Sequence, residues 1–340
     1  MKNLFFCFYL TLCSFGVFAQ IDSITVKDID SGINYKVALE DLIVGTGVEV
    51  LKLDSISWYQ KNRIGFDINE VAFVNWNAGG TNSISGLLNV EISRNYKRKY
   101  TVWDNRIAAR FGINHQENVG LRKTDDILEF YSTFGYRKNT KSNWFTSANL
   151  SFKTQFGHGY SYGGDTKKTI SGFMTPAYLF LGFGTIYTRN IEKFTAYFSP
   201  ITLKSTFVLN QELANLGSFG VTPAIYDDQG NVIKEGKKVR KELGILVSST
   251  FEKEIYKNVS FRNIMSFYTD YINSFGNIDI DWEFAFDFRV NDYIRAVLGS
   301  HLKYDDDVKI TKVLDGEEVQ VSGAKVQWKQ HLGIGVVYDF

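Results

Sequence analysis

The chain ends in HLGIGVVYDF, residues 331–340, in which every second residue is apolar. The apolar positions are Leu332, Ile334, Val336, Tyr338 and Phe340, and in an extended strand this alternation puts them on one face. Chain ends that are not tied down usually fray into polar residues. The pattern therefore predicts that the last residues form a strand built into a sheet.

A second stretch, residues 278–289, shows how strongly the two strand faces differ. One face carries Ile278, Ile280, Trp282, Phe284, Phe286 and Phe288, and the other carries Asp279, Asp281, Glu283, Asp287 and Arg289. A membrane barrel turns such an apolar face to lipid and the charged face to its lumen. A soluble barrel would invert the same alternation, so the pattern alone leaves both arrangements open.

Alternating segments of this kind recur from about residue 63 to the end of the chain. We expect strands near 64–74, 83–97, 100–115, 125–139, 143–157, 170–189, 194–208, 240–254, 257–270, 276–290, 292–304 and 325–340. Most of these segments are longer than the roughly 5–6 residues that are usual in soluble sheets. Their length favours strands that cross a membrane.

The connections between the strands alternate in length. Short polar turns, such as Thr140-Lys141-Ser142, alternate with long loops, such as residues 158–168 and 210–239. Outer-membrane barrels have short periplasmic turns and long external loops. We therefore predict an all-β fold: a transmembrane antiparallel up-and-down β-barrel of about 12 strands in the outer membrane.

An even number of strands returns the chain to the side from which it entered. The closing strand would then end at the periplasmic rim with Phe340. Its ending resembles the terminal signal by which Gram-negative outer-membrane proteins are recognised by their insertion machinery. The expected partners are therefore that machinery, outer-membrane lipid and a small solute.

The first residues, MKNLFFCFYLTLCSFGVFAQ, have the features of a secretory signal peptide. One Lys precedes a mainly apolar run that is too short to span a membrane as a helix. We expect 1–19 to be removed, 20–57 to form a periplasmic N-terminal segment and 58–340 to form the barrel. A lipid anchor on Cys13 is the alternative, but the small residue that this signal needs before the Cys is replaced by Leu12.

Cysteine content and charge exclude several kinds of function. Both cysteines, Cys7 and Cys13, lie in the leader, so the mature chain has neither a disulfide nor a thiolate metal site. The full chain has 38 Lys and Arg against 37 Asp and Glu, and removal of Lys2 with the leader leaves 37 of each. A neutral chain provides no argument for a nucleic-acid partner.

Four stretches together carry a resemblance to a known family: WNAGGTNS at 76–83, VWDNRIAARFG at 102–112, RKTDDILE at 122–129 and LSFKTQFGHGY at 150–160. With these stretches the chain resembles an outer-membrane family catalogued as a domain of unknown function, from about Trp58 to Phe340. The resemblance implies a barrel and the outer membrane. It brings no established catalytic or ligand residues.

The first of these stretches falls in a predicted loop that is rich in turn-forming residues. The candidate contact residues in this loop are Trp76, Asn77, Gly79, Gly80 and Asn82. The glycines allow positive φ, and the polar side chains can bond neighbouring backbone groups. The loop is either a contact surface for a ligand or a structured cover over the barrel mouth.

The inward faces of the predicted strands carry many charged residues. The candidate lumen residues are Asp104, Arg106, Arg110, Glu129, Lys153, Asp279, Asp281, Glu283, Asp287, Arg289, Arg295, His301, Lys303 and Lys329. They can line a selective channel or a solute-binding lumen. They can equally pair with one another in a plugged interior, because barrels of about eight strands fill themselves whereas barrels of 16–18 strands stay open.

An enzymatic role is the weaker alternative. His158 and Ser161 occur near the outer end of a strand, an arrangement that faintly resembles outer-membrane phospholipases. A nucleophilic Ser needs a base within hydrogen-bond reach and a third group that orients the base, and the sequence identifies no such third group. The histidines lie on separate strands, never at metal-ligand spacing. We therefore expect no catalysis, no cofactor and no metal site.

Overall fold

The computed structural model describes residues 23–27, 34–38, 57–72, 81–163, 166–189, 194–272, 275–305, 309–314 and 317–340. The chain divides into two compact units, Met1–Ser57 and Trp58–Phe340. In the first unit, β1 (Ser23–Lys27) and β2 (Asn34–Ala38) pair as an antiparallel sheet that the sequence analysis did not predict. Four of the loop candidates, Trp76, Asn77, Gly79 and Gly80, lie outside the described residues.

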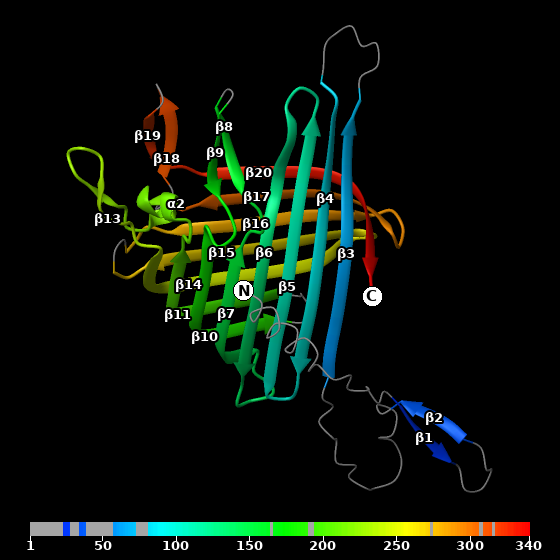
Figure 1. Ribbon diagram of the computed structural model, residues 1–340. Coiled ribbons are helices and arrows are strands. Elements are labelled where there is room, and N and C mark those ends of the chain that lie inside the picture. The colour runs from blue at the N-terminus through cyan, green and yellow to red at the C-terminus, as the bar shows by residue number, and fades with distance from the viewer. Residues whose placement is uncertain are drawn as a thin grey trace, which may run out of the picture. The chain divides into compact units, whose positions relative to one another are not determined.

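The second unit is a closed barrel of twelve strands (Figure 1). Its strands are β3 (Ser57–Val71), β4 (Ser83–Lys97), β5 (Thr101–Gln116), β6 (Gly120–Tyr136), β7 (Trp144–Thr154), β10 (Ala177–Arg189), β11 (Phe194–Phe207), β14 (Val239–Tyr256), β15 (Val259–Asp270), β16 (Asp279–Arg289), β17 (Ile294–Tyr304) and β20 (Gln327–Asp339). Each strand pairs with the next barrel strand along the chain, and β20 pairs with β3 to close the barrel. The predicted fold class and strand number are confirmed.

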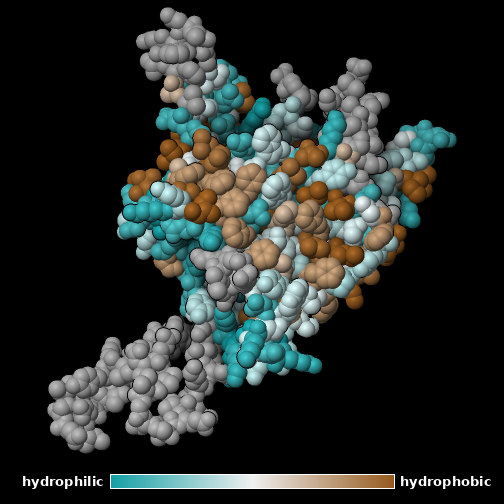
Figure 2. Space-filling model, turned by 180° about the vertical axis from the view of Figure 1, so that it is seen from behind, coloured by the Kyte–Doolittle hydropathy of each residue, from teal (hydrophilic) through white to brown (hydrophobic). Residues whose placement is uncertain are grey.

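The apolar side chains of the strands face outward. On β20 the exposed fraction is 69% for Trp328, 66% for Ile334 and 56% for Val336, whereas charged residues of the same strand face inward and form ion pairs. Apolar side chains gather on the flank of the barrel between more hydrophilic ends (Figure 2). An apolar exterior around a charged interior is the arrangement of a membrane-spanning barrel. The soluble alternative, with its inverted faces, is therefore wrong.

The C-terminal strand closes the barrel, as the opening pattern predicted. The β20–β3 ladder runs from Ile334 opposite Ile68 to Asp339 opposite Arg63. Beyond it, the backbone N–H groups of Asn62 and Phe340 donate to each other's carbonyl oxygens at 3.1 and 3.0 Å. The Arg63 guanidinium and the Asp339 carboxylate add a two-point contact of 2.6 and 2.9 Å. The chain end is thus tied into the sheet at the end of the barrel with the short turns.

The opposite end of the barrel carries additional small elements (Figure 1). They are the hairpins β8 (Gly159–Gly163) with β9 (Thr166–Ser171), β12 (Ile225–Tyr226) with β13 (Val232–Lys234) and β18 (Lys309–Leu314) with β19 (Glu317–Ala324), and the helix α2 (Gln211–Asn215). Helix α2 contributes Leu213 and Ala214 to a small apolar cluster with Val208 and Val221. No helix in the described ranges is long and apolar enough to cross a membrane.

Three strand boundaries differ from the prediction. The first barrel strand begins at Ser57 and not at residue 64. The predicted strand 170–189 is interrupted: Gly172 and Thr175 form a tight turn, and Pro176 lacks the N–H that would continue the ladder. The loop expected between the predicted strands 100–115 and 125–139 is a short turn in which Asn118 has a φ of 66°, so β5 and β6 extend as a long hairpin.

Candidate functional site

The acidic residues of β16 lie on the lumen face of the barrel. Asp279, Asp281, Glu283 and Asp287 alternate with apolar residues along the strand, and each of them forms an ion pair with a cation of another strand. On the neighbouring strand β17, the register places Lys303 opposite Asp281 and His301 opposite Glu283. Period-two alternation thus produces a row of acids beside a row of bases.

Several ion pairs cross the lumen between strands that are not neighbours in the barrel. These pairs are Arg110–Glu283 at 2.6 Å, Lys153–Asp281 at 3.5 Å, Lys204–Asp279 at 2.7 Å and Lys329–Asp125 at 2.9 Å. Strands β5 and β7 are thereby tied to β16 on the opposite wall, whereas β6 is tied to β20 and β11 to β16 over a shorter arc of the barrel. At the height of each pair along the barrel, the paired side chains occupy part of the lumen.

Asp281 is the centre of the densest group of charges. Its carboxylate lies 2.7 Å from Nε2 of His301 and 3.5 Å from the amines of both Lys153 and Lys303. Lys153 also contacts Glu129 at 2.8 Å. Asp281 therefore has three basic partners, and one of them, Lys153, has Glu129 as a second acidic partner.

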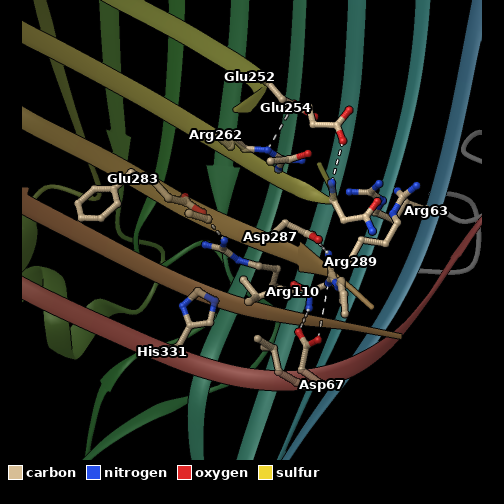
Figure 3. A pocket seen from close by; sticks show the side chains of 18 of the residues that line it. Arg63, Asp67, Arg110, Glu252, Glu254, Arg262, Glu283, Asp287, Arg289 and His331 are labelled. Atoms are coloured by element: carbon tan, nitrogen blue, oxygen red, sulfur yellow. Dashed lines mark hydrogen bonds and ion pairs between the residues drawn. The ribbon is translucent and has the colours of Figure 1, made fainter. Parts of the chain in front are cut away.

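A cavity of about 330 Å³ lies on the short-turn side of this charged layer. Its lining extends from Arg110 and Glu283 to Glu254 and Asn258 at the short turn between β14 and β15. The charged side chains that line it are Arg63, Arg110, Arg262, Arg289, Arg295, Lys253, Asp67, Asp125, Glu252, Glu254, Glu283 and Asp287. Side chains of both signs of charge line the cavity (Figure 3). Such a wall suits a small polar solute that carries hydroxyl groups or both charges.

Arg295 is the most deeply placed cation of this wall. It is 8% exposed, and its guanidinium lies 3.0 Å from Asp287 and 3.7 Å from Asp67, which is 6% exposed. Asn89 donates a 3.1 Å hydrogen bond to Asp67. These contacts hold strands β3, β4, β16 and β17 together around the cavity.

The lumen also has an apolar side, which the sequence analysis did not identify. Phe145, Ile186, Tyr197, Leu246 and Tyr268 form a buried cluster on β7, β10, β11, β14 and β15. These residues are apolar although they occupy inward positions, which are mostly polar or charged elsewhere in the barrel. The available signal in the sequence was that these inward positions carry no charged residues.

The structure also places the other predicted site residues. Arg106 contacts Glu129 at 3.5 Å, and Arg289 lies 4.0 Å from Asp339 near the short-turn rim. Asn82 donates a 2.9 Å hydrogen bond to Glu117 across the β4–β5 hairpin, away from the lumen cavity. Asp104 lies apart from the charged layer and contributes to a different cavity.

Other lumen charges were absent from the predicted set. They are Lys61, Arg63, Asp67, Glu91, Asp125, Lys204, Glu242, Glu252 and Arg262, and all of them form ion pairs. Most lie at inward positions of the same alternation, which was the available signal. Asp125 lies at the first position of the predicted strand 125–139, next to the loop that was expected to precede this strand.

The residues of the enzymatic alternative lie outside the lumen. His158 and Ser161 are both exposed, and among the described residues no hydrogen bond joins them. The His158 ring lies 6.2 Å from the ring of Tyr160.

The fold and the orientation of its faces define the protein as a transmembrane β-barrel with a charged lumen. Residues 68–160 match the family model described as a protein of unknown function (DUF3078). The resemblance drawn from the sequence is confirmed over that part of the chain. A comparison with curated protein sequences finds no match.

Solved structures of outer-membrane barrels are similar to this chain at low identity. The outer membrane channel from Pseudomonas putida F1 is 10% identical, with a TM-score of 0.38, and the match covers 87% of this chain and 100% of that one. The translocator domain of the autotransporter NalP from Neisseria meningitidis is 11% identical, with a TM-score of 0.34, and the match covers 83% and 87%. Neither likeness is close enough to transfer a function.

Proposed function

We propose that this protein resides in the outer membrane of a Gram-negative bacterium and binds a small polar solute in its charged lumen. The ion pairs across the lumen act as a gate, and the cavity on the short-turn side receives the solute. The observation that carries this proposal is the set of ion pairs between opposite walls beside a charged cavity of about 330 Å³.

The chemistry of the cavity supports a polar solute. Small-molecule sites typically have volumes of about 300–1,000 Å³ and present a few convergent polar groups. Rings of charged side chains also set selectivity in pores. A solute with its own charges can replace partners within the ion pairs and so separate Arg110 from Glu283, which now hold opposite walls together at 2.6 Å.

A closed structural barrel is the second candidate. It is favoured by the buried cluster of Phe145, Ile186, Tyr197, Leu246 and Tyr268, which fills one side of the lumen. In that case the ion pairs contribute to stability and specificity of packing, and no solute passes.

Conductance of the purified full chain in planar bilayers distinguishes the two candidates. A gated passage should give discrete conductance steps, and Asp281→Asn with Glu283→Gln should increase the open fraction and shift selectivity toward anions. Asp292→Asn, in the exposed turn before β17, is the matched control and should leave both properties unchanged. A folded barrel that is silent as parent and as variant would refute the passage and favour the closed barrel.

We also propose that the protein is not an enzyme. His158 and Ser161 are exposed on an outer hairpin without the mutual hydrogen bond that activates a nucleophile. Phospholipid or ester hydrolysis that disappears in Ser161→Ala or His158→Ala would overturn this part of the proposal.

A further inference from the structure

Asp104 occupies a distinctive position on the inner face of β5. The register places it between Asn95 of β4 and Thr133 of β6, and Thr133 is only 2% exposed. Asp104 is itself partly buried. Its carboxylate therefore belongs to the interior of the barrel, near the end with the short turns.

The surroundings of Asp104 differ from those of the other inward acids. Asp67, Glu129 and Glu283, for example, each lie within 4.0 Å of a Lys or Arg nitrogen. Among the described residues, no hydrogen bond or ion pair reaches the Asp104 side chain, and the charge of Lys97 acts on it from a greater distance. A partly buried carboxylate without a Lys or Arg neighbour leaves a negative charge that is not compensated within the barrel, and a cationic ligand would compensate it.

A cavity of about 490 Å³ adjoins this carboxylate. It has no lining residue in common with the cavity beside Arg110 and Glu283. Val102, Phe145 and Ile186 give it an apolar floor, and Phe145 and Ile186 are each only 3% exposed. Asn95 and Thr188 add neutral polar groups. The cavity thus combines one acid with apolar surface.

The cations of this cavity do not neutralise Asp104. Arg137 donates from Nε to the carbonyl oxygen of Lys99 at 3.0 Å and from Nη1 to that of Ser142 at 2.7 Å. Its guanidinium also lies 4.9 Å from the ring centroid of Phe145. These contacts hold Arg137 at the rim. Lys97 is exposed and forms no ion pair with Asp104 within 4.0 Å.

We propose that this second cavity binds an organic ammonium compound, with the cationic nitrogen at Asp104 and an apolar body on Phe145 and Ile186. A metal ion fits poorly, because no group of three or more His, Cys, Asp or Glu side chains is placed to hold one within the described part of the chain. The site is independent of solute passage, since it uses other residues and another cavity.

Titration calorimetry on the purified full chain in non-ionic detergent tests this site. The probes are n-butylammonium, n-butanol and n-butyrate, which share an apolar body and differ in charge. We expect saturable binding of n-butylammonium and binding of the other two that is weaker by about tenfold or more, which corresponds to about 1.4 kcal/mol. Asp104→Asn should lose at least the same factor for n-butylammonium, and Asp292→Asn should retain parental affinity.

The outcomes are decisive in either direction. Absence of n-butylammonium binding to the parent, equal binding of n-butyrate, or unchanged affinity in Asp104→Asn would each overturn the proposal. Without ligand, Asp104→Asn should be at least as resistant to urea as the parent, because the unpaired charge is gone. A variant that is less stable than the parent would show that the carboxylate has a structural partner, and would also overturn the proposal.

Discussion

Arg295 and Asp67 form an ion pair that passes over Gly335. Arg295 lies opposite Gly335 in the β17–β20 ladder, and Gly335 lies opposite Asp67 in the β20–β3 ladder. The Arg295 guanidinium therefore reaches across a whole strand to the Asp67 carboxylate, at 3.7 Å. The absence of a side chain at Gly335 makes this contact over the closing strand of the barrel possible.

Substitution of this glycine should weaken barrel closure. A Cβ at Gly335 would collide with Oδ1 of Asp67 and would lie 2.5 Å from the carbonyl oxygen of Phe66. We expect Gly335→Ala to reduce the free energy of unfolding by about 1–3 kcal/mol, as overpacking does. Urea titration of the refolded barrel measures the change. Gly157→Ala is the control, because a Cβ there meets its first neighbour at 3.5 Å; equal stability of the two variants would contradict the role of Gly335.

Removal of a buried lumen cation should be more damaging. Lys204 has a side chain that is 5% exposed and lies 2.7 Å from Asp279 and 3.6 Å from Glu242. Lys204→Met leaves both acids without this cation, and we expect a loss of about 3–5 kcal/mol in the free energy of unfolding. Lys234→Met, on the exposed outer strand β13, should change it by less than about 0.5 kcal/mol. A Lys204→Met barrel with parental stability in urea would show that these pairs do not hold the walls together.

A charge on the lipid-facing surface should disrupt the barrel in membranes. Phe286 lies on the outward face of β16, where its ring centroid is 4.9 Å from that of Phe261. Phe286→Arg should cost about 2–4 kcal/mol if the position lies near the bilayer midplane. Folding titrations in lipid vesicles measure this cost. Ile233→Arg, at an exposed position of the β12–β13 hairpin, should be nearly neutral; the reverse order of effects would invert our assignment of the two faces.

The C-terminal residue should matter for assembly in cells. Phe340 stacks on Tyr338 at 5.4 Å on the outward face, and its backbone pairs with Asn62 at the barrel seam. We expect Phe340→Asp to lower the amount of barrel in the outer membrane several-fold. Asp228→Ser, in the β12–β13 turn, should leave that amount unchanged, since exposed loop tips tolerate substitution. Immunoblots of membrane fractions compare the two, and equal amounts would count against a role of the terminus in insertion.

The sequence by itself determined the strands and their two faces. The alternation of Leu332, Ile334 and Val336 with small or polar neighbours is a local property with a period of two. It can therefore be recognised without knowledge of the fold. The same pattern predicted the closing role of the last strand. It failed where a single residue overrides the period, as at Pro176, and where the turn between β5 and β6 is tighter than its polar composition indicates.

The tertiary structure alone decided which inward residues meet. Arg110 and Glu283 are 173 positions apart, and only closure of twelve strands brings their side chains within 2.6 Å. Closure also gathered Phe145, Ile186 and Tyr268 into an apolar side of the lumen and left Asp104 without a partner beside its own cavity. The alternation along one strand predicts that a side chain points inward. Its partner across the lumen depends also on the register of every strand pair that lies between the two residues around the barrel.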